Sequence, residues 1–400
     1  MTGSILDSES PAVPYRTRTF SGLHGPVRVT TPAPRDAWRE IARADPSTGP
    51  SQIPEWLECA CASEGWIDAS RLYETREGRR MVVPLVRRPA VRFPSLPARL
   101  DIYASMPHGW SVGGILAPGG VTVEDIEAVA PDLAATSGAR IMIRPGFSAV
   151  PSWSEAMSRH GARLPRRCDT GTSATYILDL DGGFDAVWET RFSPKARSGI
   201  RNARRKAAEA GLVIECGSSP QSVADFYDVY LRWLDRRAVE RNMPLALARR
   251  LGRRREPLRR FETVARVFGE QSRIWVASLD GVPVAAAYAV YHEGVGMGWR
   301  AYSDRDLAGN LRAHELLQVS AIEHACRLGC RIFDMGQTGG VSGLEHVKRR
   351  FGGVVHPTPE VAWEGLPLSS LGRGFVALRR TVERGSLALH QRRAGNGHEL

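Results

Sequence analysis

Residues 310–338 read NLRAHELLQVSAIEHACRLGCRIFDMGQT, and this stretch decides how the rest of the chain is interpreted. Asn310 is a good N-cap, and Gly329 is a good residue to end a helix. Apolar and small side chains between them recur at helical spacing, which predicts a helix over 311–328 with one buried stripe: Ala313, Leu316, Leu317, Ser320, Ala321, Ala325 and Leu328. The run at 331–334 then predicts a short buried strand. The stretch therefore predicts the helix-to-strand step of an α/β unit.

The order of elements around this stretch occurs twice. Upstream of it, two strands are predicted at 273–278 and 282–291, joined by a Leu-Asp-Gly turn. The first half of the chain predicts two strands, a helix and a further strand at 71–75, 81–87, 121–137 and 140–143. The motif Gly-x-Arg-Ile comes directly before the last strand in both halves. We therefore expect an α+β protein of two tandem units.

The expected organisation has four parts. The first 27 residues are polar and lack periodicity, so 1–27 predicts a loose N-terminal arm. The two units are expected over 28–165 and 170–365, on either side of a stretch that contains several Pro and Gly residues. The end of the chain, 366–400, predicts a basic helix and a polar tail.

Composition excludes several classes of protein. The fractions of hydrophobic residues (42%) and charged residues (24%) exclude a disordered or collagen-like chain. The first residues lack a basic segment followed by an apolar one, and the longest apolar run is about half of what a membrane-spanning helix needs. We therefore expect a cytoplasmic protein with no transmembrane segment. The six cysteines match no zinc or thioredoxin spacing, so no metal is expected.

Positive charge is concentrated in one region. The formal net charge is +11, and the segment 186–260 holds 18 basic and 8 acidic residues. Such an excess favours an anionic partner, which could be a nucleic acid, a phosphorylated cofactor or an anionic surface. The alternative is a set of arginines on solvated helix faces. Only Lys195, Lys206 and Lys348 are lysines, which suggests that some of these positions need a compact ammonium group.

Several catalytic signatures are absent from the sequence. It contains no P-loop, no G-x-S-x-G nucleophile elbow and no H-E-x-x-H zinc motif, since Gln318 replaces the second histidine of the last. Two features remain. One is the glycine-containing loop 304–309 before the Asn310-capped helix, whose free amides would suit a pyrophosphate. The other is an aspartate at a strand end, a glycine loop and then a lysine on a short helix, an arrangement that builds sites at sheet edges.

The second feature carries a family resemblance. The sequences FDMGQT at 333–338 and GLEHVKRRFG at 343–352 resemble the C-terminal signature of the FemAB-like branch of the GNAT superfamily, which includes the BioF2-like acetyltransferases. RSGIRNARRK at 197–206 is similar to a basic stretch of that family. In the first unit, SMPHGWSVGG at 105–114 is similar to its Pro-Gly-aromatic-Gly-Gly loop. The resemblance covers about 100–365 and implies two GNAT-like units.

The resemblance implies transfer of an acyl group to an amine, with a hydroxyl as the second choice. Lys348 would stabilise negative charge, and Asp334 or His314 would accept the proton, directly or through water. The donor would be held at Gly309, Asn310, Leu311, Arg312 and Gly336. The acceptor would contact Tyr103, Trp110, Trp299, Tyr302, Thr338 and Phe351. The structural alternatives are a strand-end cap for Asp334, a solvated helix residue for His314, and core packing for the aromatic residues.

The identity of the donor stays open at this point. GNAT enzymes that use acetyl-CoA carry an R/Q-x-x-G-x-G/A loop, and RDLAGN at 305–310 does not fit that spacing. Acyl-CoA is the preferred co-substrate, and no permanently bound cofactor is expected. The alternative is an aminoacyl-tRNA donor with a peptidoglycan precursor or a metabolite as acceptor. A non-enzymatic protein that binds RNA or an anionic surface is the third possibility, and peripheral membrane contact is compatible with the sequence.

Overall fold

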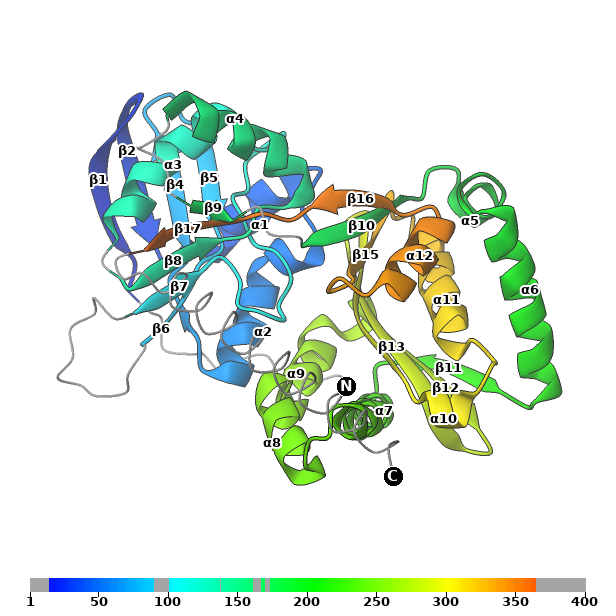
Figure 1. Ribbon diagram of the computed structural model, residues 1–400. Coiled ribbons are helices and arrows are strands. Elements are labelled where there is room, and N and C mark those ends of the chain that lie inside the picture. The colour runs from blue at the N-terminus through cyan, green and yellow to red at the C-terminus, as the bar shows by residue number, and fades with distance from the viewer. Residues whose placement is uncertain (1–13, 90–100, 137, 161–166, 170–172, 365–400) are drawn as a thin grey trace, which may run out of the picture.

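Two α+β units lie side by side in the computed structural model of the chain (Figure 1). The structure describes residues 14–89, 101–136, 138–160, 167–169 and 173–364. The N-terminal unit comprises β1–β9 and α1–α4, and the C-terminal unit comprises β10–β16 and α5–α12. The last strand, β17, returns to the N-terminal unit.

The N-terminal unit has two sheets. Its four-stranded sheet has the order β1-β2-β4-β5: Arg16–Gly22, Gly25–Thr31, Arg71–Thr75 and Arg80–Val83. Its six-stranded sheet has the order β3-β6-β7-β8-β17-β9: Ile67–Asp68, Val86–Arg88, Ile102–Ala104, Arg140–Ile143, Glu360–Glu364 and Arg167–Asp169. The helices are α1 (Arg35–Ala44), α2 (Pro54–Glu64), α3 (Val123–Ala135) and α4 (Val150–His160).

The C-terminal unit has one seven-stranded sheet. Its order is β11-β12-β13-β14-β15-β10-β16: Val213–Gly217, Ser272–Leu279, Val282–His292, Val295–Ser303, Ile332–Gln337, Ala174–Asp179 and Val354–Pro357. The longer helices are α6 (Pro194–Glu209), α7 (Pro220–Glu240), α8 (Leu245–Arg255), α9 (Leu258–Phe268), α11 (Ala313–Arg327) and α12 (Ser342–Arg350). The short ones are α5 (Gly183–Ala186) and α10 (Arg305–Ala308).

The predicted duplication is confirmed by a strand–helix–strand step in each unit. In the first, β7 and β8 are parallel neighbours with α3 between them in the chain. In the second, β14 and β15 are parallel neighbours with α11 between them. These are the parallel pairs among the strand pairings of the described residues, and a parallel pair needs such a crossover connection.

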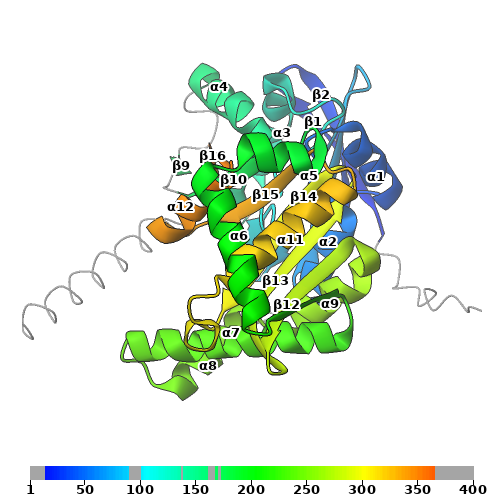
Figure 2. The same ribbon diagram turned by 90° about the vertical axis from the view of Figure 1, so that its right-hand side faces the viewer.

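The sheet of the C-terminal unit is buried on both faces, which explains the continuous apolar run of β13. One face packs against α6 and α11, which lie in front of the sheet in Figure 2. Ala285 and Ala287 face that side. Ala286 and Tyr288 face the opposite side, where α7, α9 and α2 of the N-terminal unit share one hydrophobic core. The two units are therefore joined by packed apolar side chains.

Helix α6 follows the sequence closely. Pro194 is its first residue, and the Ser193 side chain accepts a hydrogen bond from the Ala196 amide at 3.2 Å, as expected for an N-cap followed by Pro. Its buried residues are Ala196, Ile200, Ala203 and Ala207, so the arginines cover the outer face.

Two expectations about the chain ends need correction. Strand β1 lies within the expected loose arm and pairs with β2 in an antiparallel hairpin, because Phe20 packs edge-on against Tyr73 and Arg18 pairs with Asp132. Strand β17 falls within the expected second unit but pairs with β8 of the first. The expected basic helix and tail at 366–400 and the first 13 residues lie outside the described residues.

Candidate active site

Strands β14 and β15 separate soon after they meet. Their parallel pairing covers three residue pairs and ends where Met297 lies opposite Asp334, although β14 continues to Ser303 and β15 to Gln337. The register of β14 against β13 also shifts just beyond this point. The opening between the strands lines a cavity of about 660 Å³, which residues of both units enclose. An extended ligand could therefore reach backbone groups at the strand edges.

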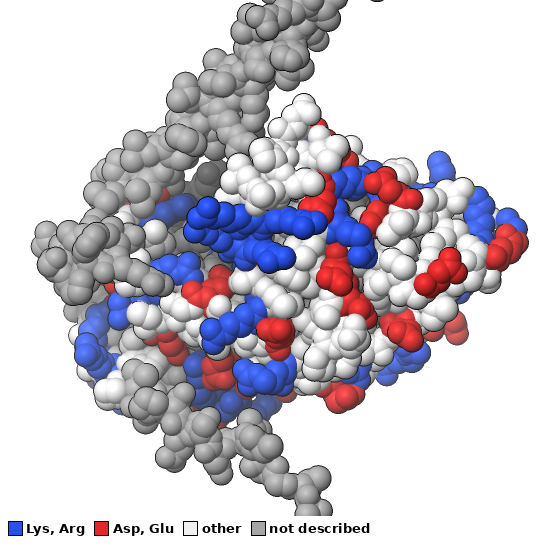
Figure 3. All heavy atoms as spheres, turned by 90° about the horizontal axis from the view of Figure 1, so that it is seen from below, with Lys and Arg blue, Asp and Glu red and all other residues white. Residues whose placement is uncertain are grey.

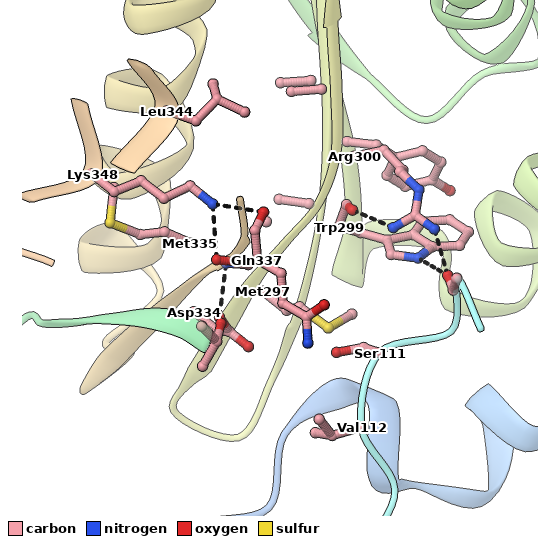
Figure 4. A pocket seen from close by; sticks show the side chains of 18 of the residues that line it. Ser111, Val112, Met297, Trp299, Arg300, Asp334, Met335, Gln337, Leu344 and Lys348 are labelled. Atoms are coloured by element: carbon pink, nitrogen blue, oxygen red, sulfur yellow. Dashed lines mark hydrogen bonds between the residues drawn. The ribbon is translucent and has the colours of Figure 1, made fainter. Parts of the chain in front are cut away.

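Asp334 lies where the two strands part (Figure 4). Its carboxylate accepts hydrogen bonds from the Thr175 hydroxyl and from the Gly336 amide, the latter at 2.8 Å. Burial raises the pKa of Asp334, and these two hydrogen bonds oppose the shift. The carboxylate thus holds the turn at the end of β15 and also lines the cavity.

Lys348 projects from α12 toward the same turn (Figure 4). Its Nζ donates to the carbonyl oxygens of Gly336 at 2.8 Å and Gln337 at 3.2 Å, which leaves one of its three N–H bonds for a ligand. Only 7% of the residue is exposed. Burial lowers its pKa to about 8, and Asp334 opposes this shift. Lys348 is therefore a partly desolvated ammonium group at the wall of the cavity.

His314 lies in the first turn of α11 and also lines the cavity. Burial, followed by the charges of Lys348 and Arg305, lowers its pKa to about 4. The imidazole is therefore neutral at neutral pH and can accept a proton. Its nitrogens form no hydrogen bond with the residues that the structure describes.

Gly336 is a backbone position that the site depends on. Its φ is +75°, and an added Cβ would lie 3.1 Å from the Gly298 carbonyl oxygen. We expect Gly336→Ala to lower stability by about 1–2 kcal/mol, the ordinary cost of a left-handed conformation. Activity should fall as well, because the Gly336 carbonyl positions Lys348. Urea unfolding of this variant is compared with Gly343→Ala on α12, where nothing lies within 4 Å. If the two variants were equally stable, Gly336 would not be a position that requires glycine.

The predicted donor loop differs from expectation. The helix begins at Ala313, so Asn310 is not its N-cap; Arg312 occupies that position with φ +56° and no capping hydrogen bond. Residues 305–308 form α10, and the Asp304 side chain caps the amides of Asp306 and Leu307. The Leu311 amide donates to the Ala308 carbonyl. Most of the loop amides are therefore already bonded within the chain.

The open amides lie at the start of α11 itself. Within the described residues, the amides of Arg312, Ala313 and His314 have no acceptor. The Arg312 side chain crosses α6, where a Cβ on Gly199 would lie 2.5 Å from one of its Nη atoms and 3.3 Å from an Nη of Arg350. Arg312 also pairs with Glu315 at 3.5 Å. Two guanidinium groups, one carboxylate and the helix N-terminus thus form a region of net positive charge between α6, α11 and α12 that suits phosphate groups.

These features agree with the comparison to known families. Residues 194–349 match the family model described as an acetyltransferase (GNAT) domain. This part of the chain is a GNAT domain. The crystal structure of FemX has a TM-score of 0.59 at 13% identity, over 85% of this chain and 98% of that chain. At that identity the likeness shows the fold, and it extends across both units.

Two further solved structures are less similar. A tandem GNAT protein from the clavulanic acid biosynthesis pathway has a TM-score of 0.44 at 12% identity, over 88% of this chain and 98% of that chain. The C-terminal domain of a putative lysylphosphatidylglycerol synthetase from Agrobacterium fabrum has a TM-score of 0.45 at 13% identity, over 87% of this chain and 94% of that chain. No curated protein matches the chain in sequence.

The N-terminal unit supplies the wall opposite the GNAT domain's open strands. This wall contains His108, Gly109, Ser111, Val112 and Arg144. The Nδ1 atom of His108 lies 2.7 Å from the Arg144 guanidinium and must accept its hydrogen bond, so the ring proton lies on Nε2. Burial and the Arg144 charge lower the pKa of His108, so both favour the neutral ring. The wall therefore offers hydrogen-bond donors to a ligand in the cavity.

The structure brings together part of the predicted set of residues. Lys348, Asp334, His314, Gly336, Trp299 and Tyr302 all line the cavity. Gly309, Asn310, Leu311 and Arg312 lie outside its lining, at the approach to α11.

Four predicted acceptor contacts do not line the cavity. Trp110 is fully buried against Trp56 and donates to Glu64, so it belongs to the core between the units. Phe351 is fully buried and stacks on Phe192. Tyr103 packs at the margin of the core of the N-terminal unit, and the Thr338 hydroxyl donates to Glu345. Packing explains the three aromatic residues, and a hydrogen bond to α12 explains Thr338.

Sequence reasoning missed His108, Ser111 and Arg144 as site residues. In the sequence, the 105–114 loop carries only a family-like motif, and nothing local shows that it faces β14. No group of three His, Cys, Asp or Glu side chains within the described ranges could hold a metal ion. Among the helices that the structure describes, none is both long and apolar enough to cross a membrane.

Proposed function

We propose that the protein transfers an acyl group from acyl-CoA to an amine of a small-molecule, glycan or peptide acceptor. The observation that carries this proposal is the parting of β14 and β15 within the GNAT domain, with Asp334, Lys348 and His314 around the opening. An acyl chain placed between the strands would bring its carbonyl to this point. The phosphates of the donor would lie at the open amides of α11, beside Arg312 and Arg350.

Direct attack accounts for the groups present. The acceptor nitrogen attacks the carbonyl carbon, the new C–N bond forms, and the C–S bond to the leaving thiolate breaks. Lys348 stabilises the negative charge that develops on the donor, with the N–H bond that Gly336 and Gln337 leave unused. His314 takes the proton from nitrogen, directly or through water, since its ring is neutral. Asp334 holds the turn that positions the Lys348 partners.

The acceptor would occupy the side of the cavity formed by the N-terminal unit. His108 Nε2 and the Ser111 hydroxyl are available there, and Arg300 donates to the Gly109 carbonyl at 2.7 Å, which fixes the loop that carries them. Because Trp299 also donates to Gly109 at 3.0 Å, the acceptor wall is attached to the strand that receives the acyl group. Donor and acceptor would therefore meet in a ternary complex.

An aminoacyl-tRNA donor is the second candidate, and one observation favours it. The amides of α10 and Leu311 already form hydrogen bonds within the chain. Fewer amides are therefore free to bind a pyrophosphate than in a loop whose amides have no acceptor. A tRNA acceptor stem would instead depend on arginines distributed over a wider surface.

The nature of the donor is tested by ligand-induced stabilisation of the full chain. Acetyl-CoA or a longer acyl-CoA, at roughly a hundred times its Kd, should add about 2.7 kcal/mol of stability and raise the Tm. Arg312→Gln should reduce this shift, whereas Arg205→Gln, a replacement on the outer face of α6, should not. Absence of a shift with every CoA ester, together with retention on aminoacyl-tRNA, would favour the second candidate.

A further inference from the structure

Helix α8 has an unusual outer surface. The segment 241–255 contains six arginines and no acidic residue, and five of those arginines lie on α8. The same helix leaves three leucines about half exposed: Leu245 at 46%, Leu247 at 45% and Leu251 at 49%. Exposed arginine alone is ordinary, but exposed leucine within an arginine-rich helix needs an explanation.

The leucines are exposed because the opposite face of α8 is fixed. Ala248 and Gly252 are its buried residues. The Tyr230 hydroxyl of α7 donates to the Gly252 carbonyl at 3.0 Å, and a Cβ on Gly252 would lie 2.2 Å from a methyl group of Leu234. The small residues thus hold α8 close to α7. The helix cannot rotate to bury its leucines without losing this packing.

Leucine and arginine form adjacent rows on the outer face. Leu247 and Leu251 are four residues apart and therefore follow one another along the helix. Arg250 and Arg254, also four apart, form the neighbouring row, and both are exposed. The outer face therefore combines an apolar row with a cationic row.

Much of this charge is not neutralised by the protein. Arg249 pairs with Asp235 at 2.6 Å, and Glu240 is shared by Arg236 and Arg237. Arg250, Arg253 and Arg254 form no ion pair with any residue that the structure describes. Figure 3 looks onto the lower side of the molecule, where α7, α8 and α9 lie, and shows blue basic groups beside white neutral ones.

We propose that α8 docks on an anionic lipid surface, with Leu247 and Leu251 inserted among the lipids and Arg250, Arg253 and Arg254 at the phosphates. A basic amphipathic helix that carries leucines binds at such interfaces by combining apolar burial with charge attraction. A nucleic acid would satisfy the arginines but would leave the leucines in water, and α8 offers no aromatic side chain for base stacking. Arg255, the last residue of α8, lines the cavity, so docking would bring the rim of the cavity to the surface.

The test is co-sedimentation of the full chain with vesicles of phosphatidylcholine, alone or mixed with phosphatidylglycerol. Binding should require the anionic lipid and weaken as salt is added. Leu247→Ser combined with Leu251→Ser should lower the partition coefficient on the order of tenfold, because apolar burial is lost. Arg250→Gln, Arg253→Gln and Arg254→Gln together should also weaken binding and flatten its salt dependence.

Matched controls keep the comparison specific. Leu328→Ser with Val354→Ser removes similarly exposed apolar groups elsewhere, at 52% and 60% exposure, and should leave binding unchanged. A second control removes the same charge from α6 and should leave vesicle binding unchanged; it combines Arg201→Gln, Arg204→Gln and Arg205→Gln. Circular dichroism and thermal melts show whether each variant is folded. The proposal is overturned if anionic vesicles do not bind the wild-type chain, or if the α8 serine variant binds them as tightly. Binding to polyuridylate without binding to vesicles would assign the basic face to RNA instead.

Discussion

Lys348→Met is expected to slow acyl transfer by about two to three decades, the usual loss for one charged donor in a transition state. The ammonium group lies at the turn of β15, bonded to the Gly336 and Gln337 carbonyls, with one N–H bond left for the substrate. Methionine has a similar length but no donor and no charge. Single-turnover rates with a saturating donor measure the chemical step directly.

The pH dependence of the rate should show that the charged form of Lys348 is the active one. Burial lowers the pKa of Lys348 to about 8, so the ammonium form is present below that pH and is lost as the pH rises through it. The wild-type rate should therefore fall above about pH 8. Loss of the His314 proton occurs near its pKa of about 4 and should limit the rate only on the acid side.

Lys348→Arg separates charge from shape. Arginine keeps its charge at all accessible pH values, but its planar fork is larger, and Lys348 is almost fully enclosed. We expect Lys348→Arg to be nearly as slow as Lys348→Met. Thermal melts must accompany both variants, because a folding defect would imitate the kinetic loss. A folded methionine variant with the wild-type rate would remove Lys348 from the site.

The local elements of the GNAT domain could be predicted because local sequence determines them. The Ser193-Pro194 start of α6 and its buried small residues depend on capping and helical period alone. The helix and strand around Gly329 follow in the same way, and Gly329 does adopt a positive φ of +70°. Lys348 and Asp334 could be connected because only a turn and α12 separate them.

Contacts between distant segments could not be predicted in this way. Trp110 and Trp299 each follow a glycine and both belong to the core between the units, but only Trp299 also lines the cavity. The difference depends on how the two units pack. Asn310 is not the N-cap because α10 and the left-handed Arg312 move the start of α11 two residues, from the predicted residue 311 to Ala313. Strand β1 was missed because its partners, Tyr73 and Asp132, are far away in sequence.

Glu64→Gln is expected to lower the free energy of unfolding by about 3 kcal/mol, because a buried arginine loses its nearest carboxylate and keeps only the more distant Glu256, at 3.7 Å. Arg260 is 2% exposed, and its Nε and Nη2 lie 2.7 and 2.6 Å from one Glu64 oxygen. That oxygen also accepts from the Trp110 indole at 2.7 Å. Glu64 ends α2 of the N-terminal unit and Arg260 belongs to α9, so the pair joins the two units.

Urea unfolding of the Glu64→Gln chain measures the loss, and Glu58→Gln on the same helix is the matched control. Glu58 is about half exposed and pairs with Arg35, so its replacement should cost about 0–1 kcal/mol. Both variants should unfold in one transition, because the core around Trp56 contains side chains from both units. Two separate transitions, or equal losses in the two variants, would show that this pair does not hold the units together. If it does, Glu64→Gln should also raise KM for the acceptor, since Arg260 lies against Gly109 beneath the acceptor wall.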